Sequence, residues 1–285
     1  MLHLTTEQKI HHTLRIAIAM CFIGHGTFGI ITKPIWCNYF AVFGIGQAMA
    51  YHLMPVLGSF DILLGLIMLA YPMRAIALWL VIWGIVTASL RPLAHEPFAE
   101  LIERAGNFGA PLAFLILSGR GGKGWQRWFA RVPDSRPDPD GHLRPDTPLH
   151  TDSGLTKATL TQLIFCLKIV VFLLLLGHGW LNIIEKKGLL SQYSALGFSS
   201  PALAARYIGI FEIIAACSVL IRPMRPVLLV LFVWKMSTEL FYPHWELFEW
   251  VERGGSYGTI LALWFATREL NSSVSSESGY IPLAT

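Results

Sequence analysis

Long apolar runs alternate with short polar stretches along most of this chain. Within each run the apolar residues are continuous rather than alternating, which predicts helices and excludes the strands of a membrane β-barrel. A helix needs about 20 mostly apolar residues to cross a bilayer. Eight segments approach that length, at about 14–32, 50–70, 74–91, 97–118, 162–184, 202–221, 225–242 and 247–267. The pattern predicts an all-α integral membrane protein.

The two halves of the chain repeat the same polar residues in the same order. Residues from about 15 to 118 align with residues from about 168 to 267. The matched pairs include His25 with His178, Lys33 with Lys186, Asp61 with Glu212, Trp83 with Trp234, His95 with His244, and Arg104 with Arg253. Such self-similarity marks a duplicated structural unit. We therefore predict two tandem four-helix transmembrane bundles, within residues 1–118 and 159–270.

The segment between the copies differs from both. Residues 119–158 are rich in Gly, Pro, Asp and Arg, which predicts a polar linker without a core of its own. Inside it, residues 125–131 alternate aromatic and basic side chains, as in a short amphipathic membrane anchor. We predict that two short segments, 34–49 and 188–200, lie at the membrane interface. The chain is predicted to end in a Ser-rich tail at residues 271–285.

The amino-acid composition is typical of a protein embedded in a bilayer. The chain is 54% hydrophobic and 14% charged, whereas soluble domains are about 25% charged. Its net charge of +4 comes with no dense basic face, so we expect no nucleic-acid partner. None of the four cysteines forms a C-x-x-C pair, the signature of dithiol exchange or a cysteine-zinc site. The first apolar stretch lacks a cleavage site and predicts a retained transmembrane helix.

The basic residues gather on one side of the predicted bundle. The linker carries most of them, and Arg74, Arg222 and Arg225 fall on the same side if each copy crosses the membrane four times. The positive-inside rule then places the linker and both termini in the cytoplasm of a multi-pass inner (plasma) membrane protein. An even number of crossings gives both copies one orientation, which predicts a pseudo-twofold axis along the membrane normal.

Ionisable residues at membrane depth usually face a cavity, a partner or a ligand. The glycines that flank His25 and His178 leave room for a flat ligand, or for a close helix crossing with a hydrogen-bonded histidine. Asp61 and Glu212 lie near the middle of their helices and are either proton-handling groups or structural partners of these histidines or of Lys33 and Lys186. The remaining candidates are His95 and His244, each after a Pro-containing break.

One matched region breaks the symmetry. Lys235 and Glu239 in the second copy stand where the first copy has Gly84 and Ala88. Their spacing of four residues permits an ion pair on one helix face. Either this pair is a buried structural feature, or the second copy carries chemistry that the first lacks.

The glycine-rich first helix with a following lysine, and the acidic residue in a G-x-F-[DE]-I context, resemble the DoxX-like (DoxD-like) four-helix membrane family. The residues that carry this resemblance are Gly26 with Lys33, Gly179 with Lys186, and the segments around Asp61 and Glu212. The family includes the small membrane subunit of thiosulfate:quinone oxidoreductase, so the resemblance implies redox partnership with quinone. This chain departs from the pattern by fusing two units and by adding four histidines, at positions 25, 95, 178 and 244.

We therefore expect a redox-linked membrane protein that binds a quinone or haem near the extracytoplasmic side, with a possible redox partner subunit. His25 and His178 are the expected cofactor contacts, or the axial ligands if the cofactor is haem. Trp83, Trp234, Lys33 and Lys186 are further cofactor-binding candidates, and the catalytic candidates are Asp61, Glu212, His95 and His244. The alternatives are a proton-coupled solute transporter or channel and a non-catalytic assembly subunit.

The orientation is directly testable. A cysteine introduced as Asp138→Cys in the linker should react with a membrane-impermeant reagent only after the inner membrane has been permeabilised. Labelling of this position in intact cells would contradict the cytoplasmic placement.

Overall fold

The computed structural model describes residues 4–119, 124–134, 155–240 and 246–278, and these residues form helices joined by turns. The first half contains α1 (Thr6–Ile30), α2 (Trp36–Ala41), α3 (Gln47–Ala70), α4 (Arg74–Leu93), α5 (Ala99–Glu103) and α6 (Ala105–Ser118), and the linker contains α7 (Gln126–Phe129). The second half contains α8 (Lys157–Ile183), α9 (Lys187–Ala195), α10 (Pro201–Ile221), α11 (Arg225–Leu240), α12 (Glu246–Glu252) and α13 (Gly254–Ser278). The predicted all-α class is confirmed.

Five helices are long and apolar enough to cross a membrane, namely α1, α3, α4, α8 and α10. The shorter α6, with 14 residues, and α11, with 16 described residues, fall below the usual length of a crossing, which is about 20 residues. The chain therefore has several apolar helices of a membrane protein, while the predicted count of eight crossings is not established by helix length.

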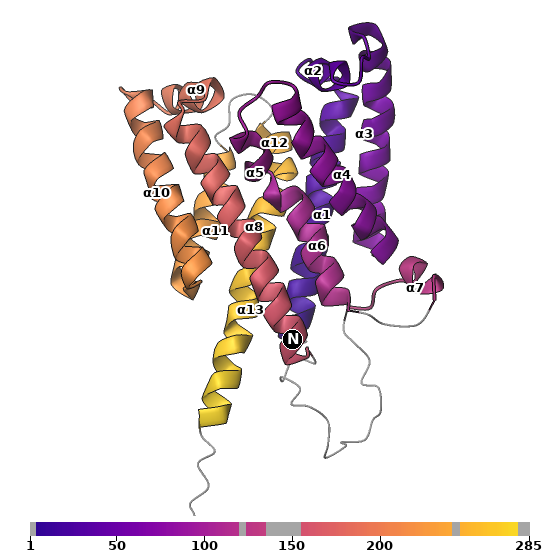
Figure 1. Ribbon diagram of the computed structural model, residues 1–285, viewed down its shortest axis with the longest axis vertical. Coiled ribbons are helices and arrows are strands. Elements are labelled where there is room, and N and C mark those ends of the chain that lie inside the picture. The colour runs from indigo at the N-terminus through magenta and orange to yellow at the C-terminus, as the bar shows by residue number, and fades with distance from the viewer. Residues whose placement is uncertain (1–3, 120–123, 135–154, 241–245, 279–285) are drawn as a thin grey trace, which may run out of the picture.

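Several helix boundaries differ from the predicted ones. α1 begins at Thr6, earlier than the apolar run, because Thr5 and Gln8 form a capping box that satisfies the first backbone amides. The fourth helix of each half is broken, at Arg104 between α5 and α6 and at Arg253 between α12 and α13. α13 also continues to Ser278 through part of the predicted tail, and its last turns extend beyond the other helices (Figure 1).

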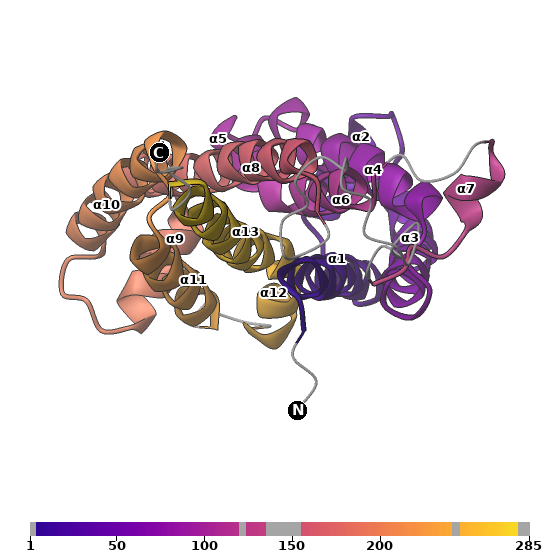
Figure 2. The same cartoon turned by 90° about the horizontal axis from the view of Figure 1, so that it is seen from below.

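The two halves interleave rather than standing as separate bundles. α1 packs against α12 and α13 of the second half, and α8 packs against α5 and α6 of the first half. α6 and α13 also contact each other. Viewed from below, α1, α6, α8 and α13 occupy the middle, while α3 and α10 lie toward opposite edges (Figure 2). The core is thus built mainly from helices that are distant in sequence.

Glycines set the distances between these helices. A Cβ on Gly106 would lie 2.7 Å from the carbonyl carbon of Gly255, and a Cβ on Gly177 would lie 2.6 Å from Cα of Glu103. Gly24 faces the backbone of Glu252 in the same manner. Small residues at such crossings allow backbones to approach closely, as is common where lipid-exposed helices associate.

The two ends of the molecule have different contents. α2 and α9 lie at one end, whereas the start of α1 lies at the opposite end and α7 toward it (Figure 1). The first part of the linker is docked there, because the Arg74 guanidinium donates to Ser118 O at 2.9 Å and to Arg127 O at 3.1 Å. Val132 is buried in the core, so this segment is less independent than its composition predicts. Trp125 and Phe129 of the predicted anchor are exposed.

The close approach of α6 to α13 gives a stability prediction. Gly106→Ala should lower the thermal unfolding temperature in detergent, because the added methyl group overlaps Gly255, and overpacking of this kind costs about 1–3 kcal/mol. Gly46→Ala is the matched control, since a Cβ at Gly46 meets nothing within 4 Å. Equal unfolding temperatures for the two variants would contradict the predicted contact.

Candidate functional site: two unequal cavities beside histidine–carboxylate pairs

Each half of the chain places one histidine against one buried carboxylate. His25 Nδ1 on α1 lies 2.8 Å from Asp61 Oδ2 on α3, and His178 Nδ1 on α8 lies 2.5 Å from Glu212 Oε2 on α10. The glycine that follows each histidine permits this closeness, since a Cβ on Gly26 would lie 2.8 Å from the Ile62 side chain. The sequence left either histidines or lysines as structural partners of these carboxylates. The structure shows that Asp61 and Glu212 contact the histidines and neither Lys33 nor Lys186.

A cavity of about 310 Å³ lies beside the first pair. Its polar lining includes His25, Tyr39, Asp61, Arg91, Arg104 and Asn107. Its apolar lining comes chiefly from α2, α3 and α4, with Trp36, Phe43, Leu53, Val56 and Trp83 among the contributors. The cavity is thus mostly apolar, with a cluster of polar groups.

A smaller cavity of about 200 Å³ lies beside the second pair. Its lining includes His178, Gln192, Tyr193, Trp234, Thr238 and Glu239. Trp83 and Trp234 therefore occupy corresponding places in the two cavities, as do His25 and His178. Four of the expected cofactor contacts therefore border a cavity, namely His25, Trp83, His178 and Trp234.

Beside the second cavity, the tryptophan N–H and both carboxylate oxygens have partners in the protein. Trp234 Nε1 donates to Glu212 Oε1 at 3.3 Å, while the other carboxylate oxygen contacts His178. Lys235 Nζ lies 3.1 Å from Glu239 Oε1 and 3.9 Å from Glu212 Oε1, and all three side chains are buried. The buried intrahelical pair is therefore present, and it supplies the carboxylate of Glu212 with a second cationic neighbour.

The corresponding atoms beside the first cavity are not satisfied. Asp61 is one methylene shorter than Glu212 and is only 1% exposed. Among the described residues, neither Asp61 Oδ1 nor Trp83 Nε1 has a hydrogen-bond partner. Gly84 and Ala88 offer no polar atom in place of Lys235 and Glu239. The first half therefore leaves one buried acceptor and one buried donor beside its cavity.

The lysines do not border either cavity in this structure. Lys33 Nζ lies 2.6 Å from Glu249 Oε1, and Lys186 Nζ lies 2.5 Å from Glu100 Oε1, so each lysine neutralises a glutamate of the other half. Glu100 and Glu249 are largely buried, and a buried carboxylate requires a countercharge. The expectation that both lysines contact the cofactor is corrected accordingly.

Two arginines complete this central network. Arg253 contacts Glu103 of the first half and lies 3.8 Å from Glu239. Arg104 lies 2.6 Å from Glu103 and 3.5 Å from Glu100, four residues before it on the chain. Arg104 also borders the first cavity. The helix breaks at Arg104 and Arg253 therefore bring charges from both halves into one buried cluster.

Tyr39 is a site residue that sequence reasoning missed. It lies on the short helix α2, and its hydroxyl donates to Glu96 at 2.5 Å. Burial raises the pKa of Tyr39, so the phenol keeps the proton that it donates. Arg91 lies 3.1 Å from Glu96 and packs over the Tyr39 ring. No sequence motif marks this group, since α2 is short and unremarkable in composition.

His95 does not join the site. Its side chain is exposed, and its φ of 67° places it in the left-handed turn that ends α4. The expectation that His95 points into the interior is therefore wrong, because the residue serves the turn between α4 and α5. Its counterpart His244 lies outside the described residues.

The two cavity histidines do not form one cofactor site. His25 and His178 border different cavities and contact different carboxylates. Each imidazole already uses Nδ1, and no cavity among the described residues is lined by both. The pair therefore does not fit a single haem with two axial histidines.

No family model matches this chain, and neither a curated protein nor a solved structure matches it.

Proposed function

We propose that the first cavity binds a quinone or quinol and that the chain is a redox-linked protein of the plasma membrane. The observation that carries the proposal is the pair of unpartnered buried atoms beside this cavity, Asp61 Oδ1 and Trp83 Nε1. A buried polar atom without a partner is costly, so in a native structure it calls for a water, an ion or a ligand.

The chemistry of the two atoms favours a hydroxyl group. A hydroxyl donates its hydrogen to a carboxylate and accepts from an indole N–H, which matches Asp61 and Trp83 respectively. A quinol carries such a hydroxyl at each end of its ring. Its oxidised form carries carbonyls, which accept from Trp83 but have no hydrogen to donate to Asp61 Oδ1. The site should therefore bind the quinol more tightly than the quinone.

The apolar lining suits the remainder of such a molecule. Phe43 and Val56 border the cavity and are each 63% exposed, Phe43 in the turn after α2 and Val56 on α3. Exposed apolar residues on a membrane-spanning helix face acyl chains. A lipid-soluble ligand would enter sideways between α3 and α4, with its ring toward His25 and Asp61.

The histidine–aspartate pair would handle a proton of the bound ligand. Reduction of a quinone to a quinol takes up two electrons and two protons, and oxidation releases them. In the proposed reaction a redox partner subunit exchanges both electrons, Asp61 exchanges one proton with the ligand hydroxyl beside it, and the proton of the second hydroxyl is exchanged with solvent. His25 holds Asp61 through Oδ2, which leaves Oδ1 directed to the ligand.

We also propose that the two halves are related by a pseudo-twofold axis along the membrane normal. The support is the exchange of equivalent contacts, since Lys33–Glu249 corresponds to Lys186–Glu100 and the Gly24 contact with Glu252 corresponds to the Gly177 contact with Glu103. In this arrangement α5 with α6, and α12 with α13, would complete eight crossings, and the linker end would face the cytoplasm.

A proton-coupled solute transporter is the second candidate, and the broken helices favour it. Transporters often bind substrates and ions at interrupted helices near the bilayer midplane. The breaks at Arg104 and Arg253 carry a buried cluster of charges. A transporter should bind a polar solute at this cluster and be indifferent to quinol, which separates the two candidates.

The two tryptophans provide a matched test of the quinol site. Trp83→Phe should weaken binding of a short-chain benzoquinol about tenfold, because it removes the unpartnered donor, and one hydrogen bond is worth about 0.5–1.5 kcal/mol. Its unfolding temperature should change little. Trp234→Phe should leave the affinity unchanged and lower the unfolding temperature, because it breaks the bond to Glu212. Calorimetric titration in detergent measures the first effect and thermal unfolding the second.

The reverse pattern would contradict the proposal, and so would equal affinities in both variants and the unsubstituted protein. Failure of the unsubstituted protein to bind any benzoquinol would reject the quinol site and favour the transporter.

The length of the carboxylate side chain gives a second test. Asp61→Glu should weaken benzoquinol binding, because the longer side chain reaches toward Trp83 as Glu212 reaches Trp234. It should not lower the unfolding temperature, since the charge and the contact with His25 are kept. Glu212→Asp should not create a second binding site, because Lys235 and Glu239 remain beside it. Unchanged affinity in Asp61→Glu would show that the unpartnered atoms do not hold the ligand.

A further inference from the structure

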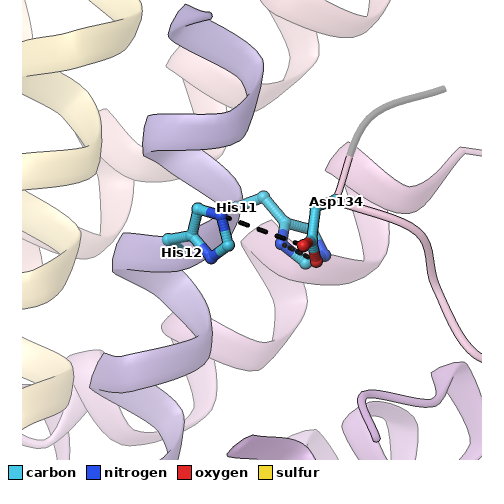
Figure 3. Close-up of side chains that lie close together, drawn as sticks. All are labelled: His11, His12 and Asp134. Carbon is cyan, nitrogen blue, oxygen red and sulfur yellow. Dashed lines mark ion pairs between the residues drawn. The ribbon is translucent and has the colours of Figure 1, made fainter. Parts of the chain in front are cut away.

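A second group of metal-ligating side chains lies far from both cavities. His11 and His12 on α1 and Asp134 after α7 place one ligand atom each within 4.8 Å of one another (Figure 3). His11 Nδ1 lies 3.5 Å from Asp134 Oδ1, and His12 Nε2 lies 4.0 Å from Asp134 Oδ2. The group sits about 21 Å along α1 from His25, at a rise of about 1.5 Å per residue. It is therefore independent of the quinol site.

His11 is the unusual member of this group. Its side chain is 2% exposed, and neither ring nitrogen has a hydrogen-bond partner among the described residues. A neutral imidazole has one nitrogen that donates a hydrogen bond and one that can accept a hydrogen bond or bind a metal. A buried ring with both nitrogens unused is costly, and a bound cation or an ordered water would remove that cost.

The fold brings Asp134 to this ring by specific contacts. Val132 N donates to Pro72 O at 2.8 Å, and the backbones of Arg131 and Met73 form an isolated antiparallel β-bridge. The segment before Asp134 is therefore fixed on the turn between α3 and α4. Arg15 Nη1 donates to Asp134 Oδ1 at 3.0 Å. This bond orients the carboxylate while Oδ2 remains available, which is how outer partners commonly position a metal ligand.

The surroundings are compatible with a cation. Arg15 adds a positive charge, but Asp134 neutralises it, and the buried Glu7 lies one turn before His11 on α1. The His12 side chain is 35% exposed and that of Asp134 is 37% exposed, which gives a path to solvent. Both side chains also have room to move toward His11.

We propose that His11, His12 and Asp134 bind a divalent transition-metal cation, with Zn²⁺ as the best match, and that this ion fastens the start of the linker to α1. Two imidazoles and one carboxylate are a common zinc ligand set that leaves a fourth position for water. Zinc bonds of about 2.0–2.1 Å place tetrahedral ligand atoms about 3.3 Å apart. The 4.0 Å separation of His12 and Asp134 therefore needs only a small side-chain rotation.

The experiment uses the full chain in detergent, without a polyhistidine tag and after removal of metals with a chelator. Titration with Zn²⁺ alone, followed by calorimetry and by thermal unfolding, should show one equivalent bound and a higher unfolding temperature. His12→Ala and Asp134→Asn should each weaken binding at least about tenfold. Both residues are partly exposed, so these variants should fold even if His11→Ala does not.

Two controls separate this site from other sources of binding. His52→Ala removes an exposed histidine of α3 and should leave zinc affinity unchanged. Trp83→Phe should also leave zinc affinity unchanged. Failure of the quinol proposal and failure of the zinc proposal can therefore be distinguished. The proposal is overturned if the unsubstituted protein binds no zinc, or if His12→Ala and Asp134→Asn bind it as the unsubstituted protein does.

Discussion

Ion pairs between the two halves, which join buried glutamates to buried arginine or partly exposed lysine side chains, hold this protein together. Lys33 pairs with Glu249, Lys186 pairs with Glu100, and Arg253 contacts Glu103. Removing one partner would leave an uncompensated buried charge, which costs far more than a surface ion pair is worth. The pairs therefore fix α1 against α12 and α8 against α5, and glycines at the crossings allow the helices to come close enough. The positions of His25 and His178 follow, because these residues lie on α1 and α8.

The halves meet the same electrostatic requirement in two ways. Glu212 has His178, Trp234 and Lys235 around it, so its carboxylate is satisfied without a ligand. Asp61 has the contact with His25 but leaves one oxygen unpartnered. A difference of one methylene, together with Gly84 and Ala88, thus separates a half whose central carboxylate and tryptophan N–H are partnered from one in which an acceptor and a donor are unpartnered. Under the proposed function, duplication permits this division, since one copy keeps these atoms partnered while the other would accommodate a ligand.

The short helices at one end of the molecule shape the two cavities. α2 contributes Tyr39 and Trp36 to the first cavity, and α9 contributes Gln192 and Tyr193 to the second. Their polar groups are held by the protein, as the Tyr39 hydroxyl is by Glu96 and the Tyr193 hydroxyl by Asn182. The histidine group around Asp134 lies toward the opposite end of α1, where the linker begins. Ligand binding and linker attachment are therefore spatially separate.

The sequence by itself determined the helical class, the internal repeat of polar residues and the candidacy of His25 and Asp61, because these depend on apolar run length and on the order of polar residues. It left open whether a histidine or a lysine contacts each carboxylate. The interleaving of the halves was decided only by tertiary structure, since the charge pairs that cause it join residues far apart in the sequence, as Lys33 and Glu249 are. Tertiary structure alone also decided the place of Lys33, which the sequence pattern assigned to a cofactor, and of His95, which lies in a turn with its side chain exposed. Sequence spacing reports which face of a helix a side chain occupies. It does not report which distant helix covers that face, and that choice decided which atoms remained unpartnered.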